Sequence, residues 1–554
     1  MMRKIIIPAI IFAAPALAFA QSTVDAYSLS QTELKGSARF MSMGGAFTAL
    51  GGDISTLGQN PAGVAVYRGS EIGATLDLNF RSYNTQTPYG SSKDNQTKVF
   101  CNNFGYVGTA WIGSGLRSIS WGATYGRVAS FDRVTHGYNN PTSTSLTNYI
   151  AGFSGGQKPG DLDFEYNDRG DITYNPYLDS DCDWLSILAY NSYMINDRPG
   201  SPNQYMGLYQ NGTVGDALYN VRERGYVDQY NFDLGGNVSD VVYWGIGIGV
   251  TDISYTRDSY YSESMENARV VAPGGSSVTT GDAGFDLYNT KHITGNGWNF
   301  KAGVIVKPIP SLRLGFAVHT PTYYNLSHGY DAEVDFSYYD PSSPENPANG
   351  GSFDKTKPAN PMVGNEYTEW ASFDSRLRTP WRIMAGAAVV IGNQAIVSVD
   401  YEHQAYNAMH VKYQYGYGYN DFAPDDNVNN NIKDVFKGSD IVRLGLEYRV
   451  TPQLSLRAGY NAQTCNVKQA AVDGNVEVLT SGTDPSFSLD SRLTQYISCG
   501  VGYKYKGWYF DAAYVHKNKE SKFQAYTNWD GNIAPSADVK ENYNSVVLSV
   551  GYKF

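Results

Sequence analysis

Two glycine pairs, Gly44-Gly45 and Gly51-Gly52, lie in an apolar stretch near the start of the chain, ARFMSMGGAFTALGGDISTLGQNPAG. Glycine-rich loops hold phosphates when G-x-G-x-x-G follows a strand and opens a helix, or when the P-loop pattern is present. Here the spacing is GG-x5-GG, no β-branched run precedes it, and Asn60-Pro61 would end a long helix. The sequence therefore argues against a nucleotide-binding loop of either kind.

Other reactive side chains show no catalytic or metal-binding pattern. Asp179, Asp181 and Asp183 could hold calcium, and a solvated acidic loop is the simpler interpretation. Cys182 and Cys465 could pair across external loops, but the four cysteines form no C-x-x-C motif. We therefore expect no enzyme, no cofactor and no metal site, and the seven histidines lack metal-ligand spacing: His136, His292, His319, His328, His403, His410 and His516.

The start of the chain indicates an exported protein, and the charge of the chain argues against a nucleic-acid partner. Residues 1–20 combine Arg3 and Lys4 with a short apolar run and a small-x-small cleavage site, which predicts a signal peptide and a mature chain from Gln21. A single membrane anchor is the alternative, and Pro8 and Pro15 disfavour it. The net charge is −11 over 554 residues, and the lysines and arginines form no basic patch. Nucleic acid is therefore not an expected partner.

Alternation of apolar with small, polar or charged residues recurs along the rest of the chain. In residues 440–450, for example, Leu444 and Leu446 alternate with Arg443 and Glu447. We count 14 such segments, at 71–81, 98–110, 117–130, 228–239, 241–256, 297–307, 311–324, 379–391, 394–406, 440–450, 453–464, 494–505, 507–518 and 544–554.

The connections between these segments alternate between short turns and long loops, of which 131–227 and 325–378 are the longest. A soluble β-sandwich has no reason to keep that alternation, whereas an outer-membrane barrel has short periplasmic turns and long external loops. The last strand ends on Phe554, which resembles the signal read by the barrel-assembly machinery. The fold predicted is all-β: a 14-stranded antiparallel transmembrane barrel over residues 71–554, in the cell outer membrane of a Gram-negative bacterium.

Aromatic side chains near segment ends fit the girdles of such a barrel, although general β-propensity is the alternative explanation. The tyrosines assigned to the girdles are Tyr125, Tyr255, Tyr401, Tyr448, Tyr460, Tyr503, Tyr505, Tyr514 and Tyr552.

Five cations fall on the face predicted to line the lumen. Paired cations suit the carboxylate of a fatty acid, while the commoner role is to neutralise inward Asp and Glu such as Asp400 and Glu447. The candidates are Lys301, Arg313, Arg382, Arg443 and Arg457.

Residues 21–70 precede the first strand and are therefore placed to fold into the lumen from the periplasmic end. Glycines would allow close contact with the wall, and apolar side chains would meet a hydrophobic ligand. The stretch MGGAFTALGGDISTLGQNPAG resembles the N-terminal hatch of the FadL/TodX family of outer-membrane transporters for hydrophobic compounds, whose barrel has 14 strands. On that resemblance the ligand-contacting and gating residues are Phe40, Met41, Met43, Phe47, Leu50, Asn60, Pro61 and Ala62.

The resemblance implies a channel for hydrophobic compounds such as long-chain fatty acids, with hatch-gated diffusion and release sideways into the membrane. A barrel of this fold that serves as a secretion shuttle or docking protein stays an alternative, and haem uptake would need a larger barrel. An amphipathic stretch in the second long loop would supply an external capture groove, or a helix packed on its neighbours: Trp184, Leu185, Ile187, Leu188 and Met194.

Overall fold

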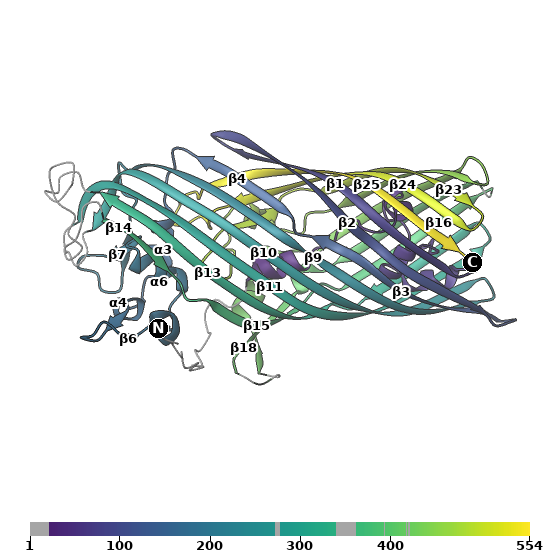
Figure 1. The fold of residues 1–554 in the computed structure, drawn as a ribbon, viewed down its shortest axis with the longest axis horizontal. Helices are drawn as coiled ribbons and strands as arrows, with labels where there is room; N and C mark the ends of the chain where they lie inside the picture. The colour runs from purple at the N-terminus through teal and green to yellow at the C-terminus, as the bar shows by residue number, and fades with distance from the viewer. Residues whose placement is uncertain (1–21, 272–277, 340–361, 393, 417, 419–420) are drawn as a thin grey trace, which may run out of the picture.

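The computed structural model describes residues 22–271, 278–339, 362–392, 394–416, 418 and 421–554. The predicted signal peptide lies outside these residues. Twenty-one strands form one closed antiparallel sheet, in which β1 pairs with β25 to complete a barrel (Figure 1). Some of the 14 barrel strands are built from two consecutive pieces, so the predicted fold class and strand number are confirmed.

Around the barrel the strands are β1 (Glu71–Thr87), β2 (Gly90–Trp111), β3 (Leu116–Ser130) with β4 (Arg133–Asn139), β9 (Val214–Val238), β10 (Val242–Val271), β11 (Val278–Ile309), β12 (Leu312–His319) with β13 (Tyr323–Tyr339), β15 (Ala371–Arg378) with β16 (Arg382–Ile391), β17 (Ala395–Gln404) with β18 (His410–Gln414), β20 (Ser439–Arg449), β21 (Leu454–Gln463), β22 (Phe487–Asp490) with β23 (Thr494–Tyr505), β24 (Trp508–Gln524) and β25 (Ser536–Lys553).

The smaller elements lie in the long connections. They are α3 (Leu146–Phe153), α4 (Pro159–Leu162), β5 (Glu165–Tyr166), β6 (Ile172–Tyr174), α5 (Pro176–Asp179), α6 (Trp184–Asn191), β7 (Ile195–Asp197), β8 (Tyr205–Gly207), β14 (Met362–Tyr367), η4 (Tyr406–Ala408), β19 (Phe422–Pro424), α7 (Asp426–Val435) and α8 (Gln469–Val472). None of the helices in the described part of the chain is long and apolar enough to span a membrane.

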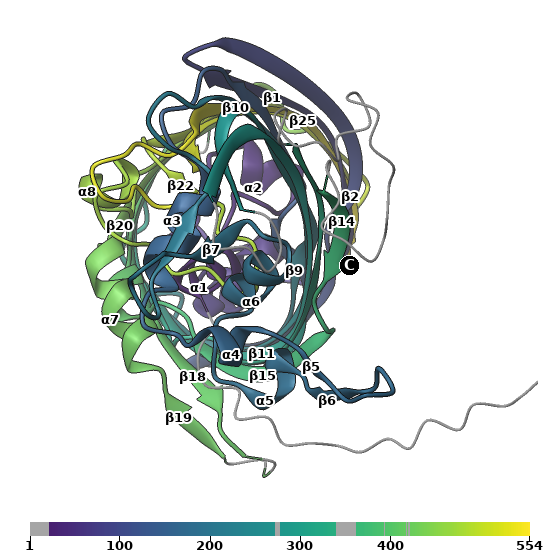
Figure 2. The same cartoon turned by 90° about the vertical axis from the view of Figure 1, so that its left-hand side faces the viewer.

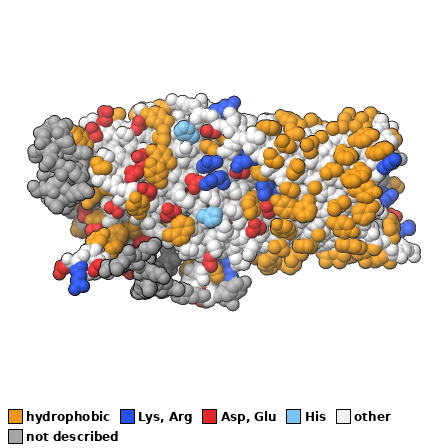
Figure 3. Space-filling view, viewed as in Figure 1, with side chains coloured by type: hydrophobic (Ala, Val, Ile, Leu, Met, Phe, Trp, Pro, Cys, Tyr) orange, Lys and Arg blue, Asp and Glu red, His pale blue; other side chains and the backbone are white. Residues whose placement is uncertain are grey.

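A band of exposed apolar side chains surrounds the end of the barrel that carries the short turns (Figure 3). In β1, for example, Ile72, Leu76 and Phe80 are about half exposed, while Asp77 and Arg81 are buried in the lumen. Water-exposed apolar side chains on this scale would be costly in a soluble protein, so the band is the surface that faces lipid.

The strands continue well beyond this band, which the alternation of apolar residues did not predict. β10 and β11 stay paired from Val242↔Val306 to Val271↔Val278, and their outward side chains above the band include charged and polar residues. Because water replaces lipid there, the outward face no longer needs apolar side chains, and the apolar pattern moves to the lumen face. Tyr255, assigned to a girdle, instead points into the lumen, where its hydroxyl donates to Glu223 at 2.7 Å.

Leu446 lies on the lipid face of β20 and is 45% exposed. We expect Leu446→Arg to lower the free energy of unfolding by about 2–4 kcal/mol, since arginine is costly at the middle of the bilayer. Heat-modifiable mobility of the folded barrel after urea titration in lipid vesicles measures this. Thr290→Arg, at an exposed position of β11 beyond the apolar band, is the matched control and should change little. Equal losses in the two variants would contradict the assignment of the lipid face.

Candidate functional site

Residues 22–70, called the plug below, fill the barrel lumen within the apolar band and extend above it. They form α1 (Thr23–Leu29), α2 (Ala38–Ser42), η1 (Ile54–Gly58) and η2 (Pro61–Val66), which lie inside the ring of strands (Figures 1 and 2). Side-chain oxygens of Ser22, Ser37, Asp53 and Asn60 accept the first backbone N–H groups of these four short helices. Such caps satisfy donors that a one-turn or two-turn helix leaves open, which lets short helices persist in a crowded lumen.

Inward-facing glycines of the wall receive the plug. A Cβ added at Gly245 would come within 3 Å of the backbone of Pro61, and one at Gly315 would meet the backbone of Thr48 equally closely. The same holds for Gly459 against the backbone of Met43 and Gly44. These contacts join backbone to backbone, so no side-chain movement would make room for a larger residue. Other wall glycines in close contact with the plug are Gly73, Gly122, Gly235, Gly303, Gly386, Gly445 and Gly500.

Ion pairs and charge-assisted hydrogen bonds add to this close fit. Arg39 of α2 binds Glu447 at 2.8 Å, and Lys35 binds Asp77 at 2.8 Å. The carboxylate of Asp400 accepts from the backbone N–H of Thr48 at 2.7 Å. Because these groups are removed from water, the loss of one partner would leave an uncompensated charge. The plug is therefore held to the wall by polar contacts as well as by shape.

Asn60 ties two parts of the plug together. Its amide nitrogen donates to the carbonyl oxygen of Thr48 at 2.7 Å, and its amide oxygen accepts from the N–H of Ala62 at 3.0 Å. Asn60 is fully buried, and Pro61 begins η2 directly after it. The element Asn60-Pro61-Ala62 thus forms a fixed corner packed against the wall at Gly245 and Gly303.

The apolar plug residues named from the sequence are brought together, but mostly away from open space. Phe40, Met41, Met43, Phe47 and Leu50 are each at most 7% exposed and pack into one cluster, which also contains wall residues. Of these five, only Phe40 lines the cavity described next. The others hold the plug to the wall, so their side chains are core residues of the plug.

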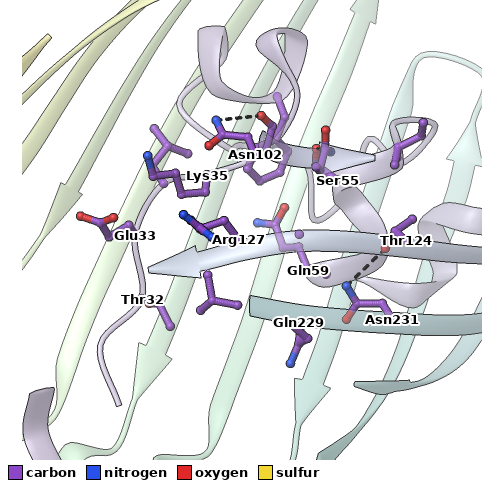
Figure 4. Close-up of a pocket in the computed structure, with 18 of the residues that line it drawn as sticks. Thr32, Glu33, Lys35, Ser55, Gln59, Asn102, Thr124, Arg127, Gln229 and Asn231 are labelled. Carbon is purple, nitrogen blue, oxygen red and sulfur yellow. Dashed lines mark hydrogen bonds between the residues drawn. The ribbon is translucent and has the colours of Figure 1, made fainter. Parts of the chain in front are cut away.

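A cavity lies between the plug and the wall near β2 and β3, with about 120 Å³ available to the centres of water molecules. Figure 4 shows polar side chains around it, including Glu33, Lys35, Gln59 and Arg127. Its apolar side is the cluster of Leu34, Phe40 and Tyr496, and Ile54 and Ile441 also line it. The cavity thus offers one apolar and one polar side to whatever occupies it.

The five lumen cations named from the sequence are divided between two roles. Arg382 binds Glu402 at 2.6 Å, Arg443 binds the same carboxylate, and both arginines line the cavity. Outside the cavity lining, Lys301 and Arg313 donate to plug carbonyls, at Leu57 (3.1 Å) and Leu50 (2.7 Å) respectively. Arg457 binds Glu447 and Asp511, at 2.7 and 2.6 Å. Every one therefore has an acidic or plug partner, which is the commoner role weighed for them.

Polar atoms without a partner remain at the cavity. Nη1 of Arg443, Oδ1 of Asn102 and Oε1 of Gln59 are buried and have no hydrogen-bond partner among the described residues. Burying such groups unpaired costs free energy, so each is a place where a bound molecule would be favoured. Arg443 is the charged member of this set and is 7% exposed.

The wall beside the cavity is interrupted. The ladder between β2 and β3 ends at Asn103↔Gly126, and among the described residues β2 continues to Gly90 with pairing to β1 alone. Register shifts on both sides, at Asn102 and next to Val128, bend the two edges. We call this interruption the seam; Asn102, Asn103, Gly126, Arg127 and Val128 line both the seam and the cavity.

The seam begins at the outer edge of the apolar band. Tyr125, one residue before Gly126, contacts the rings of Phe104 and Tyr230 on the outer surface. Arg127 binds Asp228 at 2.8 Å, and its guanidinium lies 5.2 Å from the ring centre of Phe100 on the other edge. Aromatic side chains at that height suit the headgroup region of a bilayer, so the seam faces the boundary between lipid and water.

Comparison with known proteins bears on this architecture. No protein-family model matches the sequence, and neither does any curated protein. Among solved structures, a Pseudomonas aeruginosa FadL homologue is similar with a TM-score of 0.51 and 14% identity, over 94% of this chain and 99% of that chain. The P. putida toluene transporter TodX is similar with a TM-score of 0.47 and 13% identity, over the same shares.

This chain has the FadL fold. At this level of identity the likeness concerns the fold, and it confirms the fold that the glycine-rich stretch and the 14 segments predicted.

On this FadL fold, the loops at the far end of the barrel form a packed cap. Leu185, Ile187, Leu188 and Met194, expected in a capture groove, are at most 4% exposed in a core shared with α3 and β11. Trp184 packs against that core. These side chains therefore line no open groove: they lie in the core of the cap together with apolar residues of α3, β10 and β11, as the alternative of a packed helix has it.

The remaining reactive groups of the cap also have structural roles. Asp183 caps α6 by accepting from the N–H groups of Leu185 and Ser186, and burial raises its pKa to about 6. Cys182 and Cys465 are both free and belong to different apolar clusters, so the suggested disulfide does not form. The described residues contain no group of three or more His, Cys, Asp or Glu side chains that could hold a metal ion.

Glu263 makes the cap sensitive to pH. It lies on β10 beyond the apolar band, is 2% exposed, and accepts from the N–H of Leu146 at 2.8 Å and the hydroxyl of Tyr261 at 2.6 Å. Burial raises the pKa of Glu263 to about 7. The folded cap thus retains a proton that the unfolded chain releases, so the contribution of Glu263 to stability is fully present below its unfolded pKa and is lost as pH rises through about 7.

We expect proteolysis of residues 140–213 to be faster at pH 8 than at pH 5, after correction for protease activity. Glu263→Gln should flatten this dependence, since the amide mimics the protonated acid. Glu266→Gln, an exposed position on the same strand, is the control. A pH dependence as steep in Glu263→Gln as in the wild type would contradict the assignment.

Proposed function

We propose that this chain is an outer-membrane channel for hydrophobic compounds that carry an anionic head, with long-chain fatty acids as the leading class. The observation that carries the proposal is the two-sided cavity, which lies against the seam at the lipid boundary. An acyl chain would lie along the apolar side, near Phe40 and Tyr496, and the carboxylate would meet Arg443.

The cationic side chains around the cavity support an anionic head. Lys35, Arg127, Arg382 and Arg443 line it, against the single carboxylate of Glu33. Each of the four has an acidic partner, and Nη1 of Arg443 is also buried without a hydrogen-bond partner among the described residues, so it is a donor available to a ligand. A charge-assisted hydrogen bond there would be roughly twice as strong as a neutral one.

The route that we propose passes sideways through the seam. In the membrane-spanning part the plug is packed against wall glycines, which leaves little room for passage straight through towards the periplasm. A second cavity adjoins the first at Glu33 and extends towards the cap, lined by Arg133, Glu223 and Lys517. A ligand would follow these cavities and leave through the seam into the bilayer when the plug residues beside it shift. Transport rather than catalysis is the function proposed.

The fold supports the proposed location, and the similar solved structures include proteins described as toluene transporters. Outer-membrane insertion through the assembly machinery would use the closing strand β25. Phe554 exchanges two backbone hydrogen bonds with Ser70, at 2.9 and 3.0 Å, so the end of the chain is fastened beside the start of β1.

The test is uptake by cells that lack the gene and carry either the wild-type chain or an empty vector. We expect the chain to restore uptake of a radiolabelled long-chain fatty acid and to leave uptake of a hydrophilic solute of similar mass unchanged. No restoration at a normal amount of folded barrel would overturn the proposal and favour a shuttle or docking role.

A further inference from the structure

A further cavity, separate from the two in the lumen, lies on the outside of the molecule, where two external loops meet α3. It has about 390 Å³ available to the centres of water molecules, within the range of about 300–1,000 Å³ typical of small-molecule sites. The loop between β24 and β25 supplies Trp529 and its neighbours, and the loop after α8 supplies the opposite side. The residues that define it are Tyr149, Asn475, Glu477, Thr527, Trp529 and Asn532.

Trp529 is held in place although it is 43% exposed. Its backbone N–H donates to the carbonyl oxygen of Asn532, and the N–H of Asn532 donates back at 2.9 Å. The ring of Tyr149 meets the indole edge-on at 6.2 Å, and a Cβ at Gly152 would clash with the indole. An aromatic plane fixed by its neighbours loses little freedom when a ligand stacks on it.

Three of the polar side chains around this plane are left available to a ligand. Asn475, Glu477 and Asn532 are exposed, and none of their side chains makes a hydrogen bond to the described residues. Two amides and a carboxylate provide both donors and acceptors within one hollow. Among the described residues no lysine or arginine lines the cavity, so this lining provides no cation for a phosphate or a carboxylate.

We propose that this cavity binds a neutral saccharide. A pyranose ring presents a face of C–H groups that stacks on an aromatic plane, and hydroxyls around its rim that both donate and accept. The cavity provides this combination: the indole of Trp529, the amides of Asn475 and Asn532, and the carboxylate of Glu477. An acyl chain has neither donors nor acceptors and would leave these polar groups unpaired when it covered them, which disfavours a lipid tail.

The test uses the full-length barrel in detergent and an array of neutral oligosaccharides, followed by calorimetry with the best binder. Trp529→Ala should weaken binding roughly tenfold or more, as removal of a central aromatic contact does. Asn475→Ala, which changes an exposed loop position, should also weaken it and guards against misfolding of the tryptophan variant. Trp370→Ala, at a 60% exposed tryptophan that packs on Gly329 elsewhere in the external loops, should leave binding unchanged.

Two arms separate the sources of the sugar. Free oligosaccharides test soluble ligands, and purified lipopolysaccharide and capsule-type polysaccharide test sugars of a cell surface. Binding in either arm that depends on Trp529 supports the proposal. Absence of binding to every neutral sugar, or binding that is equal in wild type and Trp529→Ala, overturns it.

Discussion

Replacing both Gly245 and Gly315 with valine should release the plug from the wall and open the barrel to small hydrophilic solutes. Each added side chain would meet plug backbone, at Pro61 and Thr48 respectively, where no rotamer change relieves the contact. Overpacking of this kind costs about 1–3 kcal/mol per site. At each of the two sites, a shift of that size changes the equilibrium between docked and undocked plug roughly 5- to 150-fold.

The measurement is single-channel conductance in planar bilayers, together with entry of a small hydrophilic dye into cells. The double variant should show conductance steps that the wild type lacks. Gly284→Val on β11 is the matched control, because that strand glycine has only one ordinary contact, at 3.6 Å, for an added Cβ. If the double variant conducts no more than the control while its barrel folds normally, the plug does not depend on the wall glycines.

The sequence was sufficient to predict the strands within the lipid band but not their full length. Lipid forces outward residues such as Leu444 and Leu446 to be apolar, so alternation marks each crossing. Beyond the band β10 and β11 face water, the outward constraint disappears, and an inward tyrosine such as Tyr255 looks like a girdle residue. Beyond the band only the backbone hydrogen bonds between neighbouring strands define β10 and β11, and the sequence does not show which residues pair.

The plug was placed in the lumen from its position before the first strand, and its close contact with the wall was predicted, but the wall glycines that receive it were not. A signal for them exists: Gly245, Gly315, Gly445 and Gly459 are lumen-facing glycines of four separate segments. Small residues repeated at one height of a barrel predict a body packed against that height. The pairing of plug residues with wall glycines depends on the fold of the plug. Short helices and their N-terminal capping residues do not determine that fold uniquely.

For the cap, the sequence predicts the helix but not what surrounds it. Trp184 to Met194 has the amphipathic spacing of a helix, and an apolar helix face is equally suited to an open groove or to a packed core. Only the neighbouring apolar residues of β11 and α3 decide between the two, and they are distant in sequence. The same limitation holds for the seam, because it arises where the ladder between β2 and β3 stops, and the sequence does not state which strands pair.

Replacing Arg443 with methionine should reduce transport of a long-chain fatty acid far more than transport of the matching methyl ester. Arg443 lines the cavity with a free Nη1, and a hydrogen bond to a charged group contributes about 1.5–3 kcal/mol. Loss of that contact corresponds to roughly a 10- to 150-fold weaker binding of the acid. Glu402 keeps Arg382 at 2.6 Å, so the substitution does not leave an isolated buried carboxylate.

The experiment measures initial uptake of both compounds at equal amounts of folded barrel, so the ratio of acid to ester reports the headgroup contact alone. Arg443→Lys keeps the charge and should recover part of that ratio, although a lysine lacks the planar fork of arginine. Arg449→Met, at the exposed end of the same strand, is the control and should leave the ratio unchanged. Equal losses for acid and ester in Arg443→Met would show that the arginine only supports the wall, and the anionic head would no longer be part of the ligand.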